Sequence, residues 1–446
     1  MNLTANSTRG RISRPAPRGN RVVVQKSLPP HRTTRIERFL LIAIIVGVSQ
    51  DRPLAAGFSL GFFILSLCGV YILFRRPGIL GRILLDPLFV TAYILLSLAS
   101  LIEFFHPYAS YSLIFRYGQM IGGAIIVASL CRDRPALRTA MHAYLIAGVC
   151  VSALSFLTFF NALHGATATD FDDANRVRSE AFKDKDTSLQ QVNLNPLTSV
   201  SAGVVALAST LSAHPPHGRY LFLAIAVFCS IASTLTLSRS VILMIIGSFA
   251  AVMFASGVWR GRTILMAGVI GAAMVMLVPD VVWLRFAFPT ETNRGNQEAR
   301  ARVYTAAVEH FPEYAMTGVG VGNFHGAWGR LSQYGWGPGV KGAHNVFIQF
   351  TIYWGVAGLL ALMALVWQAY RCLPRHCGSD PLSLQLLGVS VVALIVMLSM
   401  HNFEAKDFSL VLGLLGGTHR WIWPRGILQL ATWKQRVPRP TISSVS

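Results

Sequence analysis

Apolar residues along this chain gather in blocks of about 20 positions, the length that a helix needs to cross a lipid bilayer. The blocks do not alternate apolar and polar residues as barrel strands do, so we expect helices. The first block is short and could form one broken hairpin with the second. The pattern predicts an all-α polytopic membrane protein with about twelve transmembrane helices, at residues 39–50, 54–74, 84–104, 109–130, 137–162, 193–213, 219–237, 240–257, 262–281, 343–369, 383–400 and 407–423.

Basic residues give these helices a direction. If the amino terminus is cytoplasmic, the five short inner connections hold eleven Lys and Arg residues, whereas the four short outer connections hold three. Cytoplasmic loops are enriched in Lys and Arg, so this bias favours twelve spans with both termini inside. Two outer loops are long, at 163–192 and 282–342.

The topology divides the chain into five parts. The first 38 residues hold nine Lys and Arg and four Pro with few apolar residues, which is typical of disorder. We expect a basic, disordered cytoplasmic tail at 1–38, transmembrane helices 1–9 at 39–281, a large periplasmic loop with a surface helix at 282–342, transmembrane helices 10–12 at 343–423 and a cytoplasmic tail at 424–446.

Composition narrows the chemistry. Only 13% of the residues are charged, about half the usual share in a soluble domain. The net charge of +20 reflects the basic tails and inner loops rather than nucleic-acid binding. None of the six cysteines falls in a predicted outer loop, so no disulfide framework is expected. Cys372, His376 and Cys377 lack a fourth ligand, and we expect neither a metal nor a cofactor.

The large outer loop contains one predicted surface helix, Gln297–Phe311, which ends before Pro312. Arg300 shares an apolar face with Tyr304, so it either faces the bundle or extends to lipid headgroups. Arg302 lies on the opposite, acidic face. The other residues assigned to the two faces are Ala307 and Phe311 beside Arg300, and Ala306, Glu309 and Glu313 beside Arg302.

Two motifs follow this helix. Gly318, Gly320 and Gly322 lack both the spacing and the βαβ unit of a dinucleotide site, so they predict a tight turn near a ligand or a plain loop. His344 and Asn345 open the tenth span, with His344 expected in its first helical turn. The positive helix end would favour a neutral imidazole that acts as general base, and would attract an anion such as diphosphate. An interfacial histidine that caps the helix is the alternative.

Two arginines occupy costly positions. Arg239 separates two apolar blocks with almost no loop, and Arg116 lies within the fourth span near its outer end. An arginine at such a depth needs an anionic partner. Several arginines converging on one outer cavity would bind a diphosphate without a metal.

Taken in order, these landmarks resemble the O-antigen ligase family, which includes related exopolysaccharide polymerases. The landmarks cover about residues 193–365 and are moderately specific as a series. They are Asn195-Pro196, Ser238-Arg239, Arg300 four residues before Tyr304, the run from Gly318 to Phe324, His344-Asn345, and the run from Gly355 to Leu360.

The resemblance implies a metal-independent, GT-C-like glycosyltransferase of the bacterial inner membrane that acts at the periplasmic face. Its partners would be an undecaprenyl-diphosphate-linked glycan as donor and lipid A-core or a growing polysaccharide as acceptor. By the same resemblance, Arg239 and Arg300 hold the diphosphate and His344 deprotonates the acceptor hydroxyl. We expect further substrate contacts from Arg116, Arg302, Tyr304, Gly320, Gly322 and Asn345.

Two departures leave the acceptor open. Many relatives carry Glu where this chain has Tyr353, and the usual Trp after the Arg is Tyr304. Ligation of O-antigen and polymerisation of repeat units therefore both stay possible. A secondary transporter of an anion is the alternative from another class, although the acidic residues that ion coupling needs at mid-membrane are lacking. A structural or assembly subunit is the third hypothesis.

Overall fold

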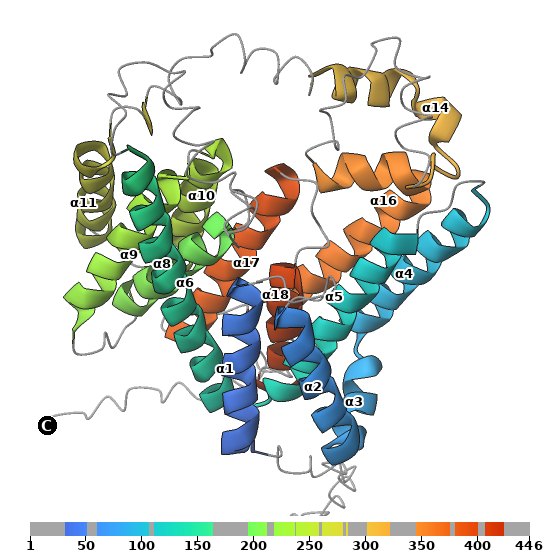
Figure 1. The fold of residues 1–446 in the computed structure, drawn as a ribbon, viewed down its shortest axis with the longest axis horizontal. Helices are drawn as coiled ribbons and strands as arrows, with labels where there is room; N and C mark the ends of the chain where they lie inside the picture. The colour runs from blue at the N-terminus through green and yellow to red at the C-terminus, as the bar shows by residue number, and fades with distance from the viewer. Residues whose placement is uncertain are drawn as a thin grey trace, which may run out of the picture. The chain divides into compact units, whose positions relative to one another are not determined.

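The computed structural model describes residues 32–50, 60–106, 111–163, 195–211, 218–236, 238–257, 261–279, 282–283, 301–321, 345–374, 380–399 and 406–422. These residues form helices and no strand, which confirms the all-α class (Figure 1). Residues 301–309 are also helical. The other helices are α1 (Arg35–Gln50), α2 (Leu60–Arg75), α3 (Pro77–Leu84), α4 (Pro87–Phe104), α5 (Tyr111–Leu130), α6 (Arg134–Leu163), α8 (Asn195–Leu211), α9 (Arg219–Thr234), α10 (Arg239–Ala255), α11 (Gly261–Leu277), α14 (Phe311–Tyr314), α16 (Val346–Cys372), α17 (Pro381–Ser399), α18 (Lys406–Gly417) and η3 (Thr418–Ile422).

Every predicted span has a helix in its place within the described ranges. Among these helices, five are long and apolar enough to cross a membrane, and six if the bent pair α2 and α3 counts as one span. Helices α8, α9, α10 and α11 contain shorter apolar stretches. The chain is thus an all-α polytopic membrane protein, while the count of twelve spans stays a prediction.

The inner connection predicted near residue 80 is a helix instead of a loop. Arg76 leaves the helical region, with φ −142° and ψ 44°, and Pro77 begins α3. Proline lacks the amide hydrogen that would continue α2 but suits the first position of a new helix. The two helices meet at 108°. Helix α1 begins at Arg35, one turn before the predicted start.

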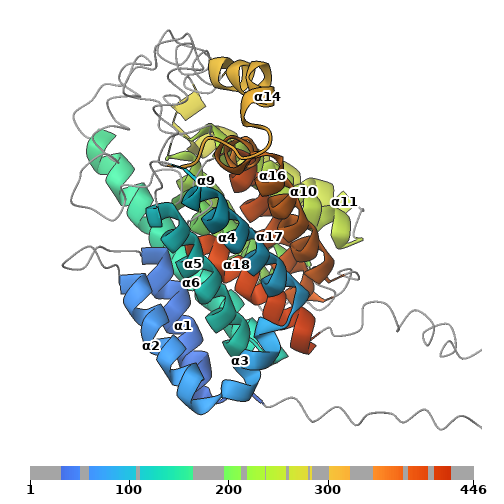
Figure 2. The ribbon, with the colours of Figure 1, turned by 90° about the vertical axis from the view of Figure 1, so that its right-hand side faces the viewer.

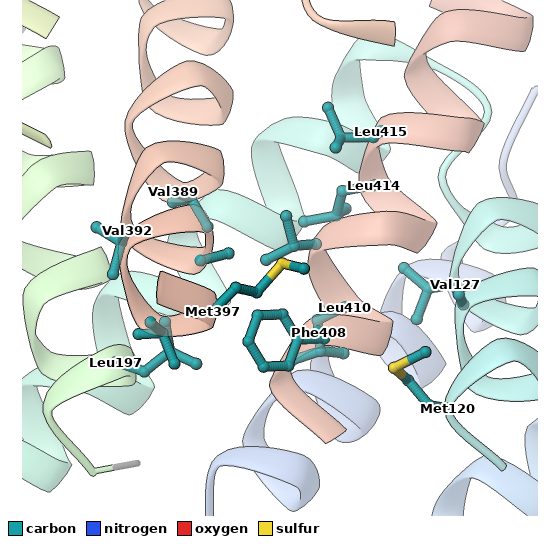
Figure 3. Packing of buried hydrophobic residues seen from close by; sticks show 14 of the residues in the cluster. Met120, Val127, Leu197, Val389, Val392, Met397, Phe408, Leu410, Leu414 and Leu415 are labelled. Carbon is teal, nitrogen blue, oxygen red and sulfur yellow. The ribbon is translucent and has the colours of Figure 1, made fainter. Parts of the chain in front are cut away.

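Small residues allow the helices to pack closely, as is common between membrane helices. A Cβ on Gly148 would lie 2.2 Å from Ala202, and one on Gly413 would lie 2.6 Å from the carbonyl oxygen of Ala124. Helices α6 and α8, and α5 and α18, are in contact. Figure 3 shows apolar side chains of α5, α17 and α18, among them Met120, Met397 and Phe408, packed into this interior.

The buried carboxylate of Glu37 contacts residues from three turns at one end of the helices. Glu37 and Thr34 form a capping box: Thr34 N–H donates to Glu37 Oε2 (2.7 Å), and Glu37 N–H donates to Thr34 Oγ1 (3.2 Å). Glu37 Oε1 also lies 3.2 Å from Arg76 Nε, and its Oε2 lies 2.5 Å from Arg132 Nη2. The side chains of Glu37 and Arg132 are each 1% exposed.

Other ion pairs at helix ends agree with the predicted alternation of direction. Arg134, at the start of α6, pairs with Asp380, just before α17 (2.5 Å). His419 in η3 lies 3.7 Å from Asp86, the N-cap of α4. Each pair joins turns that the charge pattern assigns to the same side of the membrane. Figure 2 shows α1 and α2 side by side.

Candidate functional site

The amino ends of two helices, α10 and α16, lie at the carboxyl end of α17. Helices α10 and α17 run antiparallel, because a Cβ on Gly247 would meet Ile395 and one on Gly388 would meet Val252. Arg239, the first residue of α10, therefore lies about 12 Å beyond Gly247, toward the end of α17. The side-chain Nδ2–H of Asn345, just before α16, donates to the carbonyl oxygen of Leu398 near that same end (3.2 Å). Positions 239 and 345 are thus brought to one end of the helices.

The start of α16 corrects the prediction for His344. The helix begins at Val346, and Asn345 is its N-cap, with extended φ −153° and ψ 121°. Asn345 Oδ1 accepts hydrogen bonds from the amides of Phe347 (2.9 Å) and Ile348 (3.2 Å). Asparagine is a strong N-cap because its side chain satisfies amides that the helix leaves open. His344 therefore precedes the cap instead of lying in the first turn, and it lies outside the described residues.

The helix at 301–309 packs on the apolar core through a slightly different face from the predicted one. Val303 and Ala307 are buried and Tyr304 packs against the core, whereas Arg302 is exposed, as its spacing predicts. Ala306 is buried, so its assignment to the wet face beside Arg302 is wrong. The buried stripe follows positions 303, 306 and 307 because these three residues belong to the cluster of buried apolar residues.

The helix at 301–309 and α14 form a surface hairpin, and Tyr314 lies at its end. Its hydroxyl donates to the carbonyl oxygen of Ala307, and burial raises the pKa of Tyr314 to about 12. The hydroxyl therefore remains a donor at physiological pH and fixes the turn between the helix at 301–309 and α14.

Residues 318–320 of the glycine motif pair through backbone hydrogen bonds with a broken helix, and we call this arrangement the clamp. Helix α16 is interrupted at Trp354 and Gly355, where Gly355 has φ 65° and ψ −161°. The freed carbonyl oxygens of Ile352 and Tyr353 accept hydrogen bonds from Val319 N–H (2.8 Å) and Gly320 N–H (3.0 Å). The prediction of one continuous helix over 343–369 is therefore wrong. Figure 1 shows the two differently directed parts of α16.

Helices α4 and α5 flank this clamp. Glu103, fully buried in the last turn of α4, accepts hydrogen bonds from Val321 N–H and from Trp354 Nε1. The imidazole of His106 fills the space beside Gly320, where a Cβ would lie 2.7 Å from the ring. On α5, the ring of Tyr117 packs against Trp354, with ring centroids 5.6 Å apart.

The structure places some of the predicted site residues and leaves others outside its described part. Arg116 is exposed on α5 beside Tyr117, at the end where Tyr117 packs on α16. Gly320 has φ 75° and lies in the clamp. The side chain of Arg239, together with Arg300, Gly322 and His344, lies outside the described residues. Sequence reasoning missed Glu103 and Trp354, although a carboxylate near a span end was a signal for Glu103.

Replacing Gly318 by Ala should destabilise the clamp. Gly318 has φ 68°, and a Cβ there would lie 2.1 Å from the carbonyl oxygen of Tyr353, a backbone atom that cannot turn aside. The backbone strain alone should cost about 1–3 kcal/mol, and the thermal midpoint of the detergent-solubilised protein would measure it. Gly122→Ala is the matched control, because nothing lies within 4 Å of its Cβ position in α5. Equal midpoints for the two variants would contradict the clamp.

A comparison with known protein families indicates the type of reaction to expect. A family model described as O-antigen ligase matches residues 224–363, which include α10, α11, the surface hairpin and the broken part of α16. No curated protein matches the chain significantly. The matched segment contains positions 239, 300, 318–322 and 344, whereas Asn195-Pro196, another landmark of the resemblance, lies outside it. The match covers less than half of the chain and shows that this segment is similar to the O-antigen ligase family.

Proposed function

We propose that the protein transfers a glycan from undecaprenyl diphosphate to an acceptor hydroxyl at the periplasmic face of the bacterial inner membrane. The acceptor is lipid A-core for a ligase, or a growing polysaccharide for a polymerase. One observation supports the proposal most: the amino ends of α10 and α16, both inside the segment that matches the family, lie at the same end of α17, its carboxyl end.

This arrangement suits a diphosphate. Two helix amino ends present partial positive charge to an anion, and the first turn of α10 has no side-chain cap. Arg239 begins one of these helices. We assign Arg239 and Arg300 to the diphosphate, because a guanidinium can hold two phosphate oxygens at once. We assign contacts with the rest of the donor or with the acceptor to Arg116, Arg302, Tyr304, Asn345 and the backbone at Gly320 and Gly322.

His344 is the proposed general base. It directly precedes Asn345, whose amide is bonded both to the start of α16 and to Leu398, so the backbone next to His344 is held at a fixed point. His344 takes the proton of the acceptor hydroxyl, and the oxygen forms a bond with the anomeric carbon of the donor. The bond from that carbon to the diphosphate breaks, and the diphosphate leaves with the electron pair. The arginines stabilise the charge that develops on the leaving group.

Arg239→Ala and Arg300→Ala should each block transfer in cells. In a strain that lacks the gene, each variant at matched membrane abundance should leave the donor on its lipid carrier, with turnover lower by about 10²-fold. Arg→Lys at either position should restore only part of the activity, because lysine cannot bind two oxygens with a planar fork. The readout is the size distribution of surface glycans and of the lipid-linked pool.

The pattern of accumulation also separates the candidate activities. Long chains on the carrier with bare lipid A-core indicate a ligase, and single repeat units on the carrier indicate a polymerase. Arg82→Ala, an exposed arginine of α3 at the opposite end, is the control for the loss of one positive charge. A wild-type pattern from both site variants would contradict the proposal and favour a transporter or an assembly subunit.

A further inference from the structure

Glu103 is a carboxylate in an unfavourable place. It is fully buried, and it lies in the last turn of α4, where the negative end of the helix dipole opposes another negative charge. A buried carboxylate costs free energy unless hydrogen bonds compensate it. Its Oε1 accepts the amide hydrogen of Val321 (2.5 Å) and the indole hydrogen of Trp354 (3.3 Å). These two donors come from parts of the chain 218 and 251 residues away.

The two donors belong to one junction. Val321 ends the glycine segment that pairs with α16, and Trp354 lies at the break of α16. The carbonyl oxygen of Ala315 accepts the amide hydrogen of Val356 (2.7 Å), on the far side of the break. Through its Oε1 atom, Glu103 thus connects α4, the glycine segment and the break of α16.

Aromatic packing holds the junction from the other side. Trp354 is fully buried, and its ring lies 4.7 Å from that of Phe350 and 5.6 Å from that of Tyr117, centroid to centroid. The indole can therefore hardly rotate away from Glu103. A Cβ on Gly355 would lie 2.4 Å from the carbonyl oxygen of Ala315, so the break itself has little freedom.

The break sets the direction of a short half-helix. From Val346 to Tyr353 the first part of α16 is about 12 Å long. Its far end is the cap Asn345, and position 344 precedes it. A small rotation at the break therefore displaces the start of the helix by a distance that matters for proton transfer.

We infer that Glu103 is a positioning residue for the transfer reaction, which fixes the half-helix that follows His344 by accepting hydrogen bonds from Val321 and Trp354. This inference rests on the proposed function. Glu103 does not touch the reacting atoms in this role. It acts as a hydrogen-bond acceptor, so a neutral side chain with a carbonyl oxygen in the same place should replace it.

The test compares three variants in the purified protein, reconstituted in lipid nanodiscs with an undecaprenyl-diphosphate-linked glycan and an acceptor. Glu103→Ala should lower kcat by about 10- to 100-fold, with a donor KM close to that of the wild type, because the donor site keeps its arginines. Glu103→Gln should recover most of kcat. Trp354→Phe, which removes one donor and keeps a ring, should lie between them. Glu309→Ala, an exposed carboxylate on the helix at 301–309, is the matched control.

Three results would overturn the inference: a wild-type kcat for Glu103→Ala, a kcat for Glu103→Gln as low as that of Glu103→Ala, or a loss confined to donor KM. If Glu103→Ala does not fold, as its thermal midpoint would show, the other two variants decide. Glu103→Gln active with Trp354→Phe impaired supports the inference, and a wild-type kcat for Trp354→Phe contradicts it. A wild-type protein without transferase activity would instead overturn the proposed function.

Discussion

Replacing His344 by alanine should lower the rate of glycan transfer by about 10²- to 10⁴-fold, the usual loss when a general base is removed. The acceptor hydroxyl would then have to lose its proton to water. Donor binding should change little, because the arginines that hold the diphosphate remain. Single-turnover kinetics with purified protein and labelled donor would separate the chemical step from binding.

Two comparisons make this prediction specific. Asn345→Ala keeps the base but removes the helix cap and the hydrogen bond to Leu398, so it should cost stability of about 0.5–2 kcal/mol and a smaller part of the rate. The thermal midpoint and kcat of this variant should therefore fall together. For His344→Ala the midpoint should stay and kcat should fall alone. A transfer rate for His344→Ala within a few-fold of the wild type would remove His344 from the mechanism.

Glu37→Ala should produce the largest loss of stability. Glu37 is the acidic partner of Arg132, and both side chains are 1% exposed. Removing one partner of a buried pair leaves the other charge buried and typically costs about 3–5 kcal/mol. The substitution also removes the capping box of α1 and the contact with Arg76. Denaturant titration of the detergent-solubilised protein would measure the change in the free energy of unfolding.

The exposed pair at the same end supplies the control. Arg134 and Asp380 lie 2.5 Å apart, but the arginine side chain is 54% exposed. Arg134→Ala should therefore cost at most about 1 kcal/mol. If Arg134→Ala and Glu37→Ala cost the same, burial does not decide the strength of these pairs. Adding Arg132→Met to Glu37→Ala should recover part of the loss, because it removes the uncompensated charge.

The sequence was most informative for features that one apolar block or one helix face determines. Apolar blocks located a helix for every predicted span, and helical spacing placed Arg302 on the exposed side. Local signals for two corrections were present as well: Pro77 suits the first position of α3, and Asn345 is a better cap than His344. Those elements follow from interactions between residues a few positions apart.

The junction around Glu103 could not be predicted in this way. Its hydrogen bonds join α4 to residues more than 200 positions away, and no spacing rule connects them. The break of α16 depends on the glycine segment, whose amides satisfy its carbonyl oxygens. Neither segment predicts the contact without the other. Gly318, Gly320 and Gly355 all have a left-handed backbone, which explains why glycine stands at these positions. The spacing of the glycines alone did not predict this conformation.

The most direct measurement counts the leaving group. Purified protein in nanodiscs, with labelled undecaprenyl-diphosphate-linked glycan, acceptor and a metal chelator, should release one undecaprenyl diphosphate for each glycosidic bond formed. The His344→Ala protein should release almost none over the same time. Donor that stays intact with the wild-type protein, while liposome-reconstituted protein moves the anion across the bilayer, would contradict glycan transfer and establish transport instead.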